Sequence, residues 1–137
     1  MKKFILFIAV AAGLASCAKD PIKVTNEALD GSWDVTSYTI DGTEVFGADK
    51  LVTAATYTFA MDEDATGTLK TKVTALGTEA EGGATYVISG DDGDMITLTD
   101  DDDASKTEGT ITIDSDVMTF KYDNDEGKPE VVKASKK

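Results

Sequence analysis

Short runs in which apolar and polar residues alternate fill most of the chain from Ser32 onward. Ala55, Tyr57 and Phe59, for example, occupy every second position with threonines between them. A period of two places such side chains on one face of an extended strand. Eight segments share this pattern and are predicted strands: 32–40, 53–60, 68–76, 84–89, 95–99, 110–114, 117–122 and 130–135. No segment in this region indicates a strong helix.

Clusters of aspartate, glycine and asparagine separate the eight segments, and most clusters are short enough for hairpin turns. The strands therefore form an antiparallel meander. Nearly every strand has one apolar face and one polar face, and closing the sheet on itself fills the interior and removes exposed edges. The predicted fold is all-β, a single eight-stranded up-and-down barrel. A small β-sandwich is the alternative.

The first residues form a different kind of segment. Met1-Lys2-Lys3 gives a positive start, the stretch 4–13 is apolar, and Leu14-Ala15-Ser16-Cys17 follows it. The apolar run is too short for a transmembrane helix, which needs about 20 residues. The stretch resembles a bacterial lipobox, and the alternative is an N-terminal helix with an incidental cysteine. The resemblance implies that residues 1–16 are a signal peptide, that Cys17 is acylated, and that lipid anchors the chain to a membrane.

The remaining chain suits a lipidated, polar tether at 17–29, which contains Pro21, followed by one domain at 30–137. The stretch Cys17-Ala18-Lys19-Asp20 partly resembles the surface-export signal of some Gram-negative lipoproteins. We therefore expect attachment to the outer membrane, facing either the periplasm or the cell surface.

Charge narrows the choice of partners. The formal net charge is −13, and loss of Lys2 and Lys3 with the signal peptide would make it more negative. An acidic surface repels nucleic acid and anionic lipid. All basic residues are lysine, so bidentate arginine contacts to carboxylate or phosphate are not available.

The residue types present argue against catalysis. The chain has no histidine, and its one cysteine is the predicted lipid attachment site. Most acidic residues fall in predicted turns, where contact with solvent keeps the pKa values of carboxylates ordinary. Asp62, Asp64, Thr66 and Gly67 match the start of a calcium loop, but Val73 stands where the bidentate glutamate is needed. We expect no enzyme activity, no cofactor and no specific metal site, with weak association of cations at most.

A family resemblance rests on Leu29-Asp30-Gly31-Ser32-Trp33, on Asp41-Gly42 and on the aromatic strand at 56–59. The chain resembles lipocalin-like bacterial lipoproteins. The resemblance implies a meander barrel that encloses a pocket for a small apolar ligand. Lipocalins typically place an arginine from the last strand over the tryptophan. With no arginine in this chain, Lys121 or Lys133 would substitute only in part.

Six aromatic residues are candidates for contact with a ligand: Trp33, Tyr57, Phe59, Tyr86, Phe120 and Tyr122. Trp33 either touches the ligand or acts as a plug that closes the barrel end. An eight-stranded barrel either fills with side chains or holds one small ligand, and the sequence leaves this choice open. The alternative to a ligand carrier is a ligand-free envelope or surface module that interacts with a protein partner.

Overall fold

The computed structural model describes residues 19–137. The predicted signal peptide and Cys17 lie outside the described residues. One antiparallel sheet runs in the order β2-β1-β3-β4-β5-β6-β7-β8-β9, and pairing of β1 with β9 closes it. The strands are β1 (Gly31–Ile40), β2 (Thr43–Glu44), β3 (Val52–Glu63), β4 (Thr66–Ala75), β5 (Thr78–Ser89), β6 (Met95–Asp100), β7 (Lys106–Asp114), β8 (Val117–Asp123) and β9 (Pro129–Lys136).

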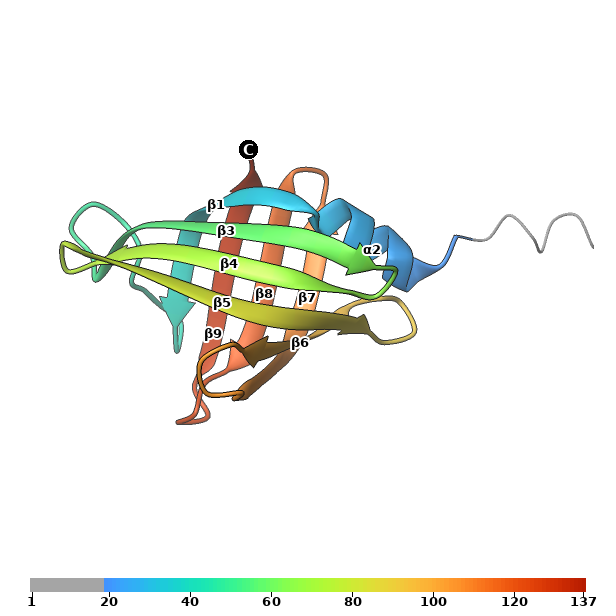
Figure 1. The fold of residues 1–137 in the computed structure, drawn as a ribbon. Coiled ribbons are helices and arrows are strands. Elements are labelled where there is room, and N and C mark those ends of the chain that lie inside the picture. Colours follow the sequence, from blue (N-terminus) through green and yellow to red (C-terminus); the bar gives the residue numbers. More distant parts are fainter. Residues whose placement is uncertain (1–18) are drawn as a thin grey trace, which may run out of the picture.

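The predicted eight-stranded up-and-down barrel is confirmed. It consists of β1 and β3 to β9, and β2 is a two-residue strand that pairs only with the end of β1. In Figure 1, β3, β4 and β5 run across the front of the barrel, and β7, β8 and β9 cross behind them at a steep angle.

Each of the eight predicted strands is present, and several extend into predicted turns. β3 continues to Glu63, β5 begins at Thr78, and β7 begins at Lys106. The start of β5 contains Gly82 and Gly83, which have low β-propensity. It is held as a strand because β4 pairs with it along its length, with an ion pair of 3.0 Å between Lys72 and Glu79.

Strand pairing in the barrel wall is incomplete in two places. β1 pairs with β3 only between Gly31 and Asp34, and β5 pairs with β6 only from Ala84 onward. Beyond Asp34, the segment 45–52 lies between β1 and β3. There Val45 donates its backbone N–H to Tyr38 and accepts from Val52, at 2.8 and 2.9 Å.

A helix, α2 (Pro21–Leu29), occupies most of the segment that the sequence predicted to be a tether. The Asp20 side chain caps it by accepting from the Ile22 N–H at 3.0 Å, and Pro21 begins the first turn. Asn26 and Leu29 are buried, and α2 contacts β3, β5 and β7 at one end of the barrel (Figure 1). Residues 21–29 of the predicted tether therefore form a helix that packs on the barrel. Within residues 19–137, no helix has the length and apolar character needed to span a membrane.

Candidate ligand site in the barrel interior

A cavity of about 140 Å³ lies inside the barrel. Aromatic and aliphatic side chains dominate its lining, and the hydroxyls of two threonines and two tyrosines are its polar groups. The lining residues are Tyr57, Phe59, Leu69, Thr71, Ile96, Leu98, Thr107, Ile111, Met118, Phe120 and Tyr122. Four of the six predicted contact residues are among them, because strand alternation on β3 and β8 directs Tyr57, Phe59, Phe120 and Tyr122 inward.

Trp33 lies outside this lining, at the end of the barrel that α2 covers. Its side chain is 0% exposed, and its indole N–H donates to the Leu29 carbonyl at 2.8 Å. The Lys136 ammonium lies 5.3 Å from the centre of the Trp33 ring and donates to the Ala28 carbonyl at 3.0 Å. Trp33 thus joins the end of α2 to the first and last strands, in the manner of a plug.

The lysine over Trp33 is not one of the two that the sequence suggested. Lys121 and Lys133 are exposed on the outer face of the barrel. Lys136 takes the position because it is the register partner of Trp33 in the β1–β9 ladder, whereas Lys133 stands opposite Ser37.

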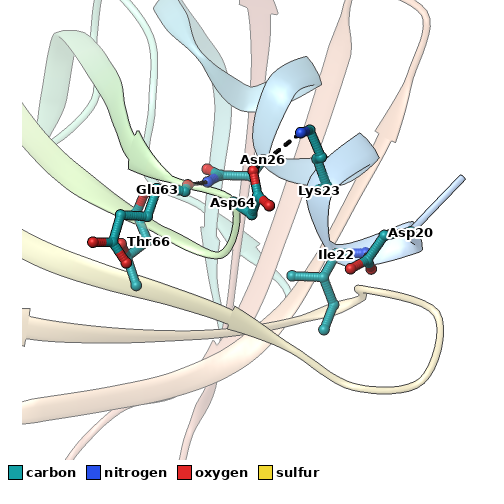
Figure 2. Close-up of polar contacts among 7 residues, drawn as sticks. All are labelled: Asp20, Ile22, Lys23, Asn26, Glu63, Asp64 and Thr66. Carbon is teal, nitrogen blue, oxygen red and sulfur yellow. Dashed lines mark hydrogen bonds and ion pairs between the residues drawn. The ribbon is translucent and has the colours of Figure 1, made fainter.

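Tyr86 also lies at the α2 end. Its hydroxyl donates to the Asn26 side-chain oxygen at 2.6 Å, and the Asn26 amide donates to the carbonyls of Glu63 and Thr66 at 2.7 and 3.2 Å. Figure 2 shows Asn26 reaching from α2 to the turn between β3 and β4. Burial, followed by the charges of Asp30 and Asp62, raises the pKa of Tyr86 to about 12. The Tyr86 ring meets Phe59 edge to face at 5.6 Å, and so supports the cavity wall from behind.

A polar cluster occupies the opposite end of the interior. The Glu130 carboxylate is 6% exposed and accepts hydrogen bonds from the hydroxyls of Tyr38 and Tyr122. It also accepts from the Asn124 side-chain amide at 2.8 Å. Burial raises the pKa of the Glu130 carboxyl, but the three hydrogen bonds together outweigh it and hold that pKa below its usual value.

Sequence reasoning missed Glu130 and Tyr38. Glu130 shares the inward face of β9 with Val132 and Ala134, so alternation alone could have placed it inside. Tyr38 could not be placed in this way. A register shift between Val35 and Ser37 changes which residues of β1 face inward, and it turns Tyr38 rather than Ser37 toward the interior.

The cluster and the cavity share Tyr122. Its ring stacks on Phe120 with centroids 4.7 Å apart, and both rings line the cavity. On the other wall, burial and then the negative charge of Glu130 raise the pKa of Tyr57 to about 12. The Glu130 charge therefore acts on tyrosine hydroxyls on both sides of the cavity.

Two other features have weaker claims to function. A hollow of about 640 Å³ near Lys70, Lys72 and Asp101 contains charges of both signs and no large apolar side chain. The acidic stretch with Asp62 and Asp64 forms the end of β3 and the turn to β4, where Asp64 pairs with Lys23 at 3.2 Å (Figure 2). Over the described residues, no three acidic side chains are grouped so that they could hold a metal ion.

Comparisons with known proteins agree with this architecture. A redesigned β-barrel aligns with a TM-score of 0.61 and 19% identity, over 82% of this chain and 94% of its own. The redesigned barrel mFAP1, whose structure is bound to DFHBI, aligns with a TM-score of 0.58 and 21% identity, over 81% and 97%. No curated protein matched the sequence. The model of the lipocalin-like domain family matches residues 29–134, and the chain belongs to that family.

Proposed function

We propose that this protein is a membrane-anchored binding protein that holds a small, largely apolar molecule in its barrel. The cavity of about 140 Å³ between the aromatic side chains of β3 and β8 is the observation that carries the proposal. Its lining combines a mostly apolar surface with a few hydroxyls, the combination typical of small-molecule sites. A barrel of the same fold, mFAP1, is bound to DFHBI, which supports this use of the fold.

The volume sets the size of the ligand. Pockets for drug-sized ligands measure roughly 300 to 1,000 Å³. An engineered apolar protein cavity of about 150 Å³ takes up benzene. The cavity here therefore suits a single aromatic ring or a short alkyl chain.

The anchor belongs to the same proposal. With Cys17 acylated, four residue steps separate the lipid from Pro21, a reach of at most about 14 Å. The α2 end of the barrel would then sit close to the membrane and the Glu130 end would point away from it. We place the protein at the outer membrane. Its role there is binding and not catalysis, in line with the absence of histidine and of a free thiol after acylation.

Toluene tests the binding proposal, using residues 18–137, which contain α2, every strand and all the buried core residues. We expect saturable binding by the wild-type chain. Thr107→Phe places a ring in the cavity and should abolish that binding. Thr110→Phe, the same change at an exposed position of β7, should leave it intact.

Two results would contradict the proposal. One is a wild-type domain that does not bind toluene saturably, which would favour the ligand-free interaction module. The other is equal binding by the Thr107→Phe and Thr110→Phe variants, because toluene would then bind somewhere other than the cavity.

A further inference from the structure

Glu130 holds its charge inside the barrel with neutral partners only. Its carboxylate accepts from two tyrosine hydroxyls and one asparagine amide. Buried charges in proteins are normally paired with an opposite charge or bound to a metal. The ion pairs within residues 19–137 are Lys23–Asp64, Lys72–Glu79, Lys128–Glu126 and Lys137–Asp34, and none involves Glu130.

The charge is present at neutral pH. Burial raises the pKa of Glu130, and the hydrogen bonds from Tyr122, Tyr38 and Asn124 lower it by more, so the net shift is downward from 4.5. The barrel interior thus contains a negative charge that no lysine of the described chain neutralises.

The cluster offers hydrogen-bond acceptors. Each tyrosine hydroxyl has one proton, and both Tyr38 and Tyr122 donate theirs to Glu130. Each hydroxyl oxygen, 3.5 Å from the other, can therefore still accept a hydrogen bond. An ionised carboxylate has about four acceptor positions, and three are filled here. A molecule that reaches this cluster therefore meets a negative charge and several acceptors.

The aromatic wall beside the cluster favours the same kind of group. Phe120 and Tyr122 stack against each other and line the cavity with Tyr57. The faces of such rings attract a cation, and the attraction grows when water is excluded. An ammonium group carries three donors and a positive charge, so it matches both the acceptors and the rings.

We propose that the ligand is a small aromatic or alkyl ammonium compound, with its apolar part in the cavity and its ammonium group at Glu130, Tyr38 and Tyr122. This inference rests on the proposed small-molecule site and assigns the chemical class of its ligand.

Benzylamine and benzyl alcohol form a matched pair of probes, because they differ mainly in the charged group. In calorimetry at neutral pH with residues 18–137, the wild-type domain should bind benzylamine about tenfold or more tightly than benzyl alcohol. Glu130→Gln keeps the size of the side chain and removes its charge, so it should weaken benzylamine binding far more than benzyl alcohol binding and abolish this preference. Asp125→Asn removes the same charge from an exposed position nearby and should preserve the preference.

The outcomes separate this inference from the proposal beneath it. Benzyl alcohol binding at least as tightly as benzylamine to the wild-type domain would overturn the ammonium assignment and leave the small-molecule site standing. Binding of neither probe, nor of toluene, would overturn both. An undiminished preference for benzylamine in a folded Glu130→Gln variant would also overturn the ammonium assignment. If that variant fails to fold, the comparison of the two probes on the wild-type domain still decides the assignment.

Discussion

Buried polar side chains occupy both ends of the barrel interior, and each end has its own role. At the α2 end, Asn26 satisfies the Tyr86 hydroxyl and two backbone carbonyls, so every polar group there has a partner. At the other end, Glu130 collects three neutral donors around one charge. The first arrangement seals the barrel, and we propose that the second recognises a ligand.

Lys136 gives a prediction about the sealed end. Lys136→Met removes the ammonium above Trp33 and its hydrogen bond to Ala28, and should lower the free energy of unfolding by about 1 kcal/mol. Lys133→Met, on the exposed face of the same strand, should change it much less. Urea denaturation of both variants provides the measurement. An equal effect of the two changes would show that the contact with Trp33 adds nothing to the free energy of unfolding beyond what an exposed lysine adds.

The sequence predicted six aromatic residues of the interior, but it missed Tyr38 and could not divide the six between the two ends. Tyr57 and Phe120 face inward by simple alternation. Trp33 is a plug because α2 reaches its indole N–H, and Lys136 covers it because of the β1–β9 register. The role of Trp33 depends on α2, an element that the sequence did not reveal. The position of Lys136 depends on pairing between two strands that lie about 100 residues apart in the chain.

At the scale of elements, strands were easier to predict than the helix. Alternation located all eight barrel strands because each buries one face. α2 has only nine residues, and Ile22, Val24 and Thr25 are poor helix formers. The Asp20-Pro21 pair was a usable signal, since aspartate at a helix cap followed by proline is a common helix start. The contacts of Asn26 and Leu29 with the barrel supply the rest of its stability.

Leu29 tests the role of α2. Leu29→Ala removes a side chain that is 0% exposed and should cost about 2 to 5 kcal/mol of unfolding free energy, since α2 would lose its main apolar contact. Val24→Ala changes a side chain that is 41% exposed, so it should cost no more than about 0.5 kcal/mol. Chemical denaturation of the pair measures the difference. Comparable losses would mean that α2 is not anchored through its buried face.

For the whole molecule, buried tyrosines make stability depend on pH at the alkaline end. Burial raises the pKa values of Tyr38, Tyr57 and Tyr86 from 10.0 to about 12 in the folded chain. The unfolded chain therefore loses these protons first. The stabilisation is fully present below pH 10 and is lost as the pH rises through about 12.

Tyr57→Phe isolates this effect from the titration of lysines. The variant should lose less stability than the wild type between about pH 9 and pH 12, because one shifted phenol has been removed. The urea midpoint of each chain, followed across that range, gives the comparison. Parallel curves for the two chains would rule out Tyr57 as a contributor.

The closed barrel as a whole could be predicted from the sequence, but the state of its interior could not. Closure follows because each of the eight strands needs one face exposed to solvent and one face buried in the core. Whether Leu98, Met118 and Phe120 fill the space or leave a cavity depends on their packing in three dimensions. Alternation on β9 could have placed Glu130 inside, but its partner Tyr38 could not be placed, because the position of Tyr38 depends on an irregularity in β1.

Native mass spectrometry can show whether the barrel holds a ligand, with the domain purified from its own host and measured before and after denaturation and after exposure to toluene and benzylamine. We expect a non-covalent adduct about the size of a single-ring amine, released on denaturation, or uptake of the probes by an empty barrel. A bare domain mass under all of these conditions would contradict this expectation.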